Sequence, residues 1–227
     1  APMLLARADA RQRRIGIALV SLATLCFAAL DACAKWLVQS LPVAEVVWLR
    51  FTAHTVLMAA ILAPTRGAAL LRVASWRLQG LRALMMVTMT AVNFAALRYL
   101  QLAETAAIQF SVPILIAVIS ALFLSEKLDA RRWLAIGVGF AGVLLIVRPG
   151  SQGFHPAIAL SLLNAVLYAC FNLLTRRMAA SETPESMMWL SALGSAVAIA
   201  PFALTQWQWP TGWLSWGVIA ACGLAGG

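Results

Sequence analysis

The sequence predicts an all-α, polytopic membrane protein. Hydrophobic residues make up 63% of the 227 residues and charged residues only 11%, and the mean hydropathy is +0.87. Soluble domains carry about 25% charged residues. The net charge of +9 does not indicate nucleic-acid binding, because the basic residues occupy the gaps between apolar runs instead of one surface.

The chain contains seven apolar runs that approach or reach the roughly 17–25 residues needed to cross a bilayer, and part of an eighth. Turn residues such as Pro64 to Gly67 and Pro210 to Gly212 separate them, and the short gaps predict antiparallel neighbours. The eighth run has 15 residues left to Gly227, so we expect a C-terminus that is cut short. The runs are Ile15–Val38, Val43–Ala63, Leu81–Leu100, Glu104–Leu124, Trp133–Val147, Pro156–Thr175, Met187–Thr205 and the run opened by Trp213.

The distribution of Lys and Arg predicts a cytoplasmic N-terminal segment over residues 1–14, in a bacterial-type inner membrane. With this orientation, 13 of the 17 basic residues lie in inner segments, as is typical of cytoplasmic loops. Glu45 lies near the outer rim, where we expect it to be solvated. The inner residues are Arg7, Arg11, Arg13, Arg14, Arg66, Arg72, Arg77, Arg82, Lys127, Arg131, Arg132, Arg176 and Arg177, and the other four are Lys35, Arg50, Arg98 and Arg148.

An offset of 141 residues aligns the chain with itself. This offset spans five helices. Because five is an odd number, the second copy has to insert in the membrane with the opposite orientation, as in many secondary transporters. We therefore predict a first repeat of five helices over 15–147 and a second, inverted repeat over 156–227 with about three helices. The aligned residues are Ile17 to Leu19 with Ile158 to Leu160, Phe27-Ala28 with Tyr168-Ala169, Asp31 with Asn172, Lys35 with Arg176, and Trp48-Leu49 with Trp189-Leu190.

Two stretches carry a family resemblance. Pro113 to Leu128, followed by Arg131-Arg132-Trp133 and the segment 137–147, resembles the end of an EamA domain of the drug/metabolite transporter superfamily. The segments 31–37 and 45–54 are similar to the branch that includes riboflavin and S-adenosylmethionine carriers. The resemblance implies a ten-helix carrier of two inverted five-helix halves around a central cavity, of which about eight helices are present here.

Asp31 and Arg50 are the principal candidates for a substrate or coupling site. Each lies about 12–14 Å from the outer rim, on adjacent antiparallel helices. Charges at this depth cost about 2.5–3.5 kcal/mol on insertion scales, and pairing would relieve both. The pair is either a structural ion pair between the first two helices or a cavity-facing pair that meets a polar substrate or takes a proton.

Seven further residues are candidates, each with a structural alternative. Lys35 shares the face of Asp31 but can extend to the interface, and His54 shares the face of Arg50 but is more often a packing residue. Pro113 removes a backbone hydrogen bond and should kink the fourth helix. The uncharged candidates, each able to bond across helices or to a ligand, are Asn93, Gln109, Asn164, Tyr168 and Asn172.

The remaining motifs exclude several classes of function. The GxGxxG match over 137–142 lies inside an apolar span and lacks the strand that a dinucleotide site needs. No metal-ligand spacing and no Walker motif is present, so no metal or cofactor is expected. The sequence favours a secondary transporter, exporter or uptake carrier, moving a small polar or amphipathic metabolite by alternating access. The alternative, a membrane-embedded enzyme acting on a lipid-like substrate, lacks a converged catalytic set.

Overall fold

The computed structural model describes residues 2–123, 130–147 and 155–225, and every regular element in these ranges is helical. Six helices are long and apolar enough to span a membrane by length and composition. This confirms the all-α, polytopic class. The elements are α1 (Pro2–Leu37), α2 (Val43–Arg66), the short 3₁₀ helix η1 (Gly67–Leu71), α3 (Trp76–Tyr99), α4 (Leu102–Gln109), α5 (Val112–Phe123), α6 (Ala130–Val147), α7 (Ile158–Met178), α8 (Pro184–Thr205) and α9 (Gly212–Ala225).

Two helices begin earlier in the chain than their apolar runs predict, because side-chain caps determine where they start. The Ser75 hydroxyl accepts a hydrogen bond from the Leu78 amide at 3.4 Å, so α3 begins five residues before the expected Leu81. The Thr183 hydroxyl accepts one from the Ser186 amide, and Pro184 occupies the first turn of α8. Residues 2–14, expected as a separate segment, continue α1 without a break.

The fourth apolar run is interrupted in the middle. The helix α4 ends at Gln109 and α5 begins at Val112, so the interruption covers Phe110 and Ser111, and Pro113 is the second residue of α5. Proline has no amide hydrogen to donate, and its ring clashes with the carbonyl four residues earlier, which is that of Gln109. The interruption therefore lies where the proline destabilises a continuous helix.

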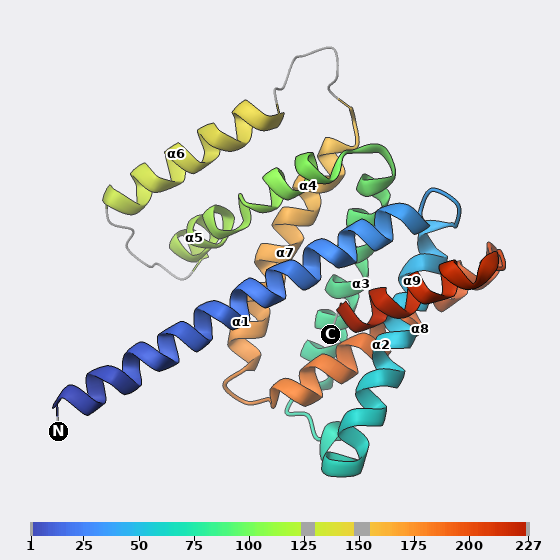
Figure 1. Ribbon diagram of the computed structural model, residues 1–227, viewed down its shortest axis with the longest axis horizontal. Coiled ribbons are helices and arrows are strands. Elements are labelled where there is room, and N and C mark those ends of the chain that lie inside the picture. Colours follow the sequence, from blue (N-terminus) through green and yellow to red (C-terminus); the bar gives the residue numbers. More distant parts are fainter. Residues whose placement is uncertain (1, 124–129, 148–154, 226–227) are drawn as a thin grey trace.

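The helices pack in an interlocked arrangement (Figure 1). The helix α8 packs along α2 and α3, while α9 packs along α1 and α2, and α7 packs along α3. The crossings are close where small residues meet. A Cβ atom at Gly194 would lie 2.8 Å from the Ala83 Cβ, and one at Gly223 would lie 2.6 Å from the Ala53 Cβ. Gly139 of the rejected nucleotide motif lies inside α6 and similarly faces Ile114.

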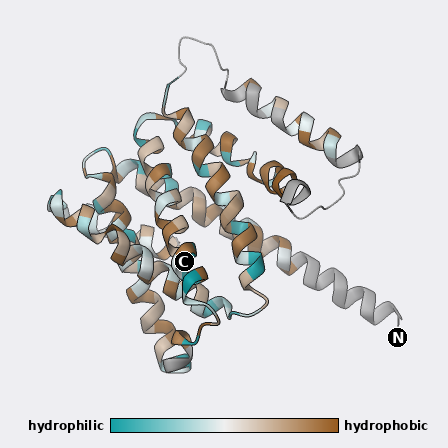
Figure 2. Ribbon diagram, turned by 180° about the vertical axis from the view of Figure 1, so that it is seen from behind, coloured by the Kyte–Doolittle hydropathy of each residue, from teal (hydrophilic) through white to brown (hydrophobic). Residues whose placement is uncertain are grey.

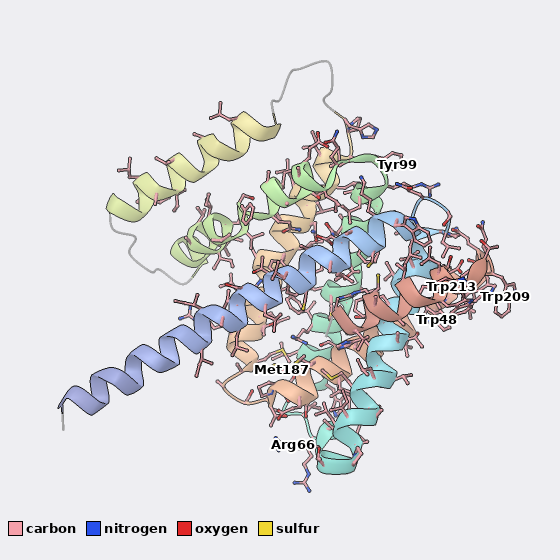
Figure 3. All side chains as sticks on the ribbon, in the orientation of Figure 1. Trp48, Arg66, Tyr99, Met187, Trp209 and Trp213 are labelled. Carbon is pink, nitrogen blue, oxygen red and sulfur yellow. The ribbon has the colours of Figure 1, made fainter. Side chains whose placement is uncertain are left out.

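The hydrophilic residues gather in the connecting segments, and apolar residues predominate along the helices (Figure 2). We name the two ends of the bundle by their residues. The basic end holds Arg66 at the end of α2 and the α7–α8 turn, and the tryptophan end holds Trp48, Trp207 and Trp209 in edge-to-face contact. Figure 3 shows Trp48, Trp209 and Trp213 together, away from Arg66 and Met187. Lys127 and Arg148 lie outside the described residues.

Candidate functional site

A cavity of about 340 Å³ lies among α1, α2, α3, α4 and α7. It brings together six of the residues that the sequence singles out, from five separate helices. One of these six is the buried Arg50, which is only 5% exposed. The lining residues are Thr24, Phe27, Ala28, Leu30, Asp31, Arg50, Met89, Thr90, Asn93, Phe94, Ala106, Gln109, Phe110, Asn164 and Tyr168.

A chain of directed hydrogen bonds crosses this cavity from α7 to α1. The Asn164 Nδ2 atom donates to the Asn93 Oδ1 atom at 3.3 Å, and the Asn93 Nδ2 atom donates to the Asp31 Oδ1 atom at 3.0 Å. The orientation of each amide is therefore determined by its neighbour. The bond engages one oxygen of Asp31, and no described residue donates to the Oδ2 atom.

Arg50 supplies the positive charge of the cavity. Its guanidinium carbon lies 4.6 Å from the centroid of the Phe51 ring, and its charge interacts electrostatically with Asp31. The helix α9 packs over this part of α2, so Arg50 is covered on the side away from the cavity. Asp31 and Arg50 are the two charged residues among the described cavity-lining residues.

The interruption in the fourth run lies at the cavity wall. Gln109 and Phe110, which end α4, both line the cavity. The C-terminal end of a helix carries partial negative charge on its last carbonyl groups. Phe27 of α1 and Tyr168 of α7, which the 141-residue offset aligns, form aromatic walls from two helices.

Three of the predicted residues lie away from the cavity. The Lys35 ammonium donates to the Leu97 carbonyl at 3.3 Å and to that of Leu100, so it binds the last turn of α3. His54 is 3% exposed beneath Gly223 at the α2–α9 crossing. The Asn172 side chain donates to the Tyr168 carbonyl on its own helix at 2.8 Å.

Burial of two charged residues differs from the sequence-based expectation. Glu45 was expected to be solvated, but its side chain is fully buried, because its Oε2 atom accepts a hydrogen bond from the Gln208 amide at 2.9 Å. Arg82 was grouped with the basic loop residues, but it is 6% exposed inside the bundle. Its guanidinium donates to the Met187 carbonyl at 2.7 Å, to the Ser191 hydroxyl and to Thr175 Oγ1 at 3.2 Å.

Thr90, Met89 and Phe94 line the cavity but were not singled out from the sequence. Thr90 lies three positions before Asn93, so helical spacing from Asn93 is a signal that identifies it. The apolar members carry no such signal.

Among the described residues, no group of three or more His, Cys, Asp or Glu side chains is arranged to hold a metal ion. A larger groove of about 700 Å³ near the tryptophan end is mainly apolar, and its charged member, Arg98, is exposed.

Residues 14–148 match the model of the EamA-like transporter family, which is more than half of the chain. The chain therefore belongs to the EamA-like transporter family, which confirms the resemblance found in the sequence.

Several curated proteins are similar to parts or most of the chain. An S-adenosylmethionine uptake transporter of Rickettsia bellii is 30% identical over 46% of this chain, and the match covers 36% of that protein. A riboflavin transporter of Rhizobium johnstonii is 32% identical over 48% of the chain, again covering 36% of the relative. The chain thus matches about a third of the length of these two relatives.

One similarity extends over most of the chain. The pseudopaline exporter CntI of Pseudomonas aeruginosa is 29% identical over 92% of the chain and 73% of its own length. A solved structure, 20% identical, superposes on 90% of this chain and 74% of its own with a TM-score of 0.62. The structural likeness shows a shared fold.

Proposed function

We propose that the protein is a secondary transporter that moves a small polar or amphipathic metabolite across a bacterial inner membrane. One observation carries the proposal: a cavity within the helical bundle contains opposite charges and a directed amide network, contributed by several helices. Intramembrane ionisable residues that face a cavity mark substrate and ion pathways. The names of the relatives, which include importers and an exporter, support the class but leave the direction open.

We further propose that two inverted repeats, 15–147 and 156–227, form the two halves. Exchanging α1 with α7, α2 with α8 and α3 with α9 converts the α3–α7 contact into the α9–α1 contact. The same exchange converts the α3–α8 contact into the α9–α2 contact. The α2–α8 contact is converted into itself, so these five contacts are consistent with the exchange, whereas the α1–α3 and α2–α3 contacts have no comparable counterpart at α7–α9 and α8–α9 among the described helices.

The closest crossings support the same exchange. Ala53 of α2 meets Gly223 of α9, and Gly194 of α8 meets Ala83 of α3. Ala53 and Gly194 are 141 positions apart, and Ala83 and Gly223 are 140 positions apart. Small residues thus occupy corresponding places at both crossings to within one residue, as related halves require.

Alternating access by rocking of the halves has to break contacts at the basic end. There the Glu182 carboxylate accepts hydrogen bonds from the Ala74 and Ser75 amides at 2.9 and 3.3 Å, which joins the α7–α8 turn to the start of α3. Arg66 and Glu185 form an ion pair of 2.7 Å. Because Arg and Lys are in excess at the basic end, we propose that this end faces the cytoplasm and that the N-terminus is cytoplasmic.

The proposal is tested by transport in proteoliposomes that contain the purified protein. Radiolabelled S-adenosylmethionine, riboflavin, pseudopaline and common amino acids would be offered under a pH gradient and in counterflow. We expect saturable flux of at least one compound, which empty liposomes should not show. The transported compound should keep its original mass. Chemical conversion of a lipid-like substrate without flux would favour the enzyme alternative and contradict the proposal.

A further inference from the structure

The groove of about 700 Å³ near the tryptophan end shares no lining residue with the cavity that contains Asp31. We propose that this groove binds one anionic phospholipid of the surrounding bilayer. The lipid phosphate binds the Arg98 side chain, and an acyl chain lies between α3 and α8. The lipid site is separate from the substrate cavity, and it does not depend on which compound the protein transports.

The shape of the groove follows from the packing of α3 against α8. At Ala83 the two helices are in close contact, because the Ser195 hydroxyl donates to the Ala83 carbonyl at 3.0 Å and a Cβ atom at Gly194 would lie 2.8 Å from the Ala83 Cβ. Nearer the tryptophan end the same two helices leave room between them. The close contact at Ala83 therefore limits the groove on the side of the basic end. The residues of α3 and α8 that form the apolar walls are Ala91, Val92, Ala95, Ile199 and Phe202.

The lining of the groove changes from polar to apolar with depth in the membrane. Arg98 lies in the last turn of α3, Gln206 directly follows α8, and Gln208 lies in the next loop at the same end. Ala91 and Ile199 each lie seven positions before Arg98 and Gln206, which is about 10 Å deeper at 1.5 Å per residue. A phospholipid has the same order, with a polar headgroup at the interface and hydrocarbon below it. The groove therefore matches one lipid along the membrane normal.

The groove is open to the bilayer. Phe202, which lines it, is 64% exposed, and Tyr99, next to Arg98, is also exposed. Large exposed side chains on membrane-spanning helices contact lipid, and aromatic residues are typical of the membrane interface. A lipid can therefore enter the groove sideways from the leaflet at the tryptophan end.

Arg98 determines which headgroup charge the site selects. It is the one charged residue among the described residues that line the groove, its side chain is exposed, and no hydrogen bond or ion pair joins it to another described residue. A guanidinium binds phosphate oxygens through two parallel hydrogen bonds. Glu45 accepts a hydrogen bond from the Gln208 amide but is itself fully buried and does not line the groove. The ammonium group of a zwitterionic lipid thus finds no acidic partner in the described lining, so an anionic headgroup is favoured.

Lipid binding is measured by native mass spectrometry of the purified protein in detergent and by its thermal unfolding. The probes are phosphatidylglycerol and phosphatidylcholine with the same acyl chains, and inorganic phosphate. We expect phosphatidylglycerol to bind and to raise the unfolding temperature at concentrations at least about tenfold lower than phosphatidylcholine. Inorganic phosphate should have no effect at these concentrations, because burial of the acyl chain supplies part of the binding. Equal effects of the two lipids, or an equal effect of inorganic phosphate, would overturn the proposal.

Matched variants assign the two parts of the lipid. Arg98→Gln should abolish the preference for phosphatidylglycerol, whereas Arg77→Gln, which removes an exposed arginine from the other end of α3, should leave it unchanged. Ala95→Phe fills the apolar part of the groove and should weaken the binding of both lipids by about tenfold or more. Ala60→Phe, at an exposed position of α2 outside the groove, is its control. If Ala95→Phe does not fold, the smaller change Ala91→Leu tests the same wall.

Two results with these variants would overturn the assignment. If Arg98→Gln keeps the preference for phosphatidylglycerol, or if Arg77→Gln loses it to the same extent, anionic lipid is attracted by the overall positive charge of the protein and not by this groove. If neither Ala95→Phe nor Ala91→Leu weakens lipid binding relative to Ala60→Phe, the acyl chain does not lie between α3 and α8.

Discussion

Arg82 should be the most important single side chain for the stability of the basic end. Its guanidinium joins three helices, because it donates from α3 to Thr175 on α7 and to Met187 and Ser191 on α8. It also lies 4.6 Å from the centroid of the Phe171 ring. The perturbation is Arg82→Met, which keeps an unbranched side chain but removes the charge and all donors.

The magnitude follows from these contacts. Side-chain hydrogen bonds between membrane helices contribute about 0.6 kcal/mol each on average and up to about 1.7. Three such bonds give roughly 2–5 kcal/mol, and a desolvated cation–π contact adds about 1–2 kcal/mol. Removing a charge from the bundle recovers about 2.5 kcal/mol or more of insertion cost. We therefore expect a net loss of about 0.5–4.5 kcal/mol in the free energy of unfolding.

The assay is reversible unfolding in mixed micelles with increasing denaturing detergent, followed by tryptophan fluorescence. Arg77→Met is the matched control, because Arg77 lies on the same helix but is exposed. Its effect should stay within about 0.5 kcal/mol. If Arg82→Met unfolds at the same detergent fraction as Arg77→Met, the contacts of Arg82 do not stabilise the folded state and the reasoning is refuted.

Three further predictions concern the helix crossings, the contact of Glu182 with the segment before α3, and the cavity. Gly223→Ala should lower the free energy of unfolding by about 1–3 kcal/mol, because the new Cβ atom would lie 2.6 Å from the Ala53 Cβ. Gly217→Ala is the control, because its new Cβ atom enters open space and should not destabilise α9. Equal unfolding midpoints of the two variants would contradict this prediction. Glu182→Gln should cost about 0.5–2 kcal/mol by weakening the hydrogen bonds from the Ala74 and Ser75 amides, and Glu185→Gln should cost less than about 1 kcal/mol. The reverse order on detergent unfolding would count against a stabilising role of the Glu182 contact. Asn93→Leu should lower kcat/KM for transport by about tenfold or more by releasing Asp31, with little change for Thr88→Val, whose exposed hydroxyl bonds its own helix; unchanged transport in Asn93→Leu would refute the role of the network.

The helices were predictable because their length and apolarity are dictated by the bilayer. Their ends depend on caps such as Ser75 and Thr183, which are local hydrogen bonds, so hydrophobicity alone misplaced the start of α3. The helix interruption before Pro113 follows from the missing amide hydrogen, although the sequence does not give its extent.

The cavity was predictable in part, because depth along a helix follows from the rise per residue. Asp31, Arg50 and Asn93 meet there, as expected for polar residues buried at similar depth. Depth along a helix does not tell which neighbouring helix a side chain contacts. Lys35 therefore proved to bind α3, and Arg82 and Glu45 proved to be buried by contacts more than 100 positions away in the sequence.

The most direct test of the central claim is cysteine labelling of the cavity in proteoliposomes. In a background with the four native cysteines replaced by alanine, Thr24→Cys places a thiol at the cavity wall, and Leu22→Cys places one on the apolar surface of the same helix, where Leu22 is 58% exposed. A hydrophilic maleimide given access to both sides of the membrane should label Thr24→Cys and stop flux, the transported compound should slow that labelling, and Leu22→Cys should remain unlabelled. Equal labelling of the two variants, or labelling of Thr24→Cys that leaves flux intact, would contradict a transport pathway through this cavity.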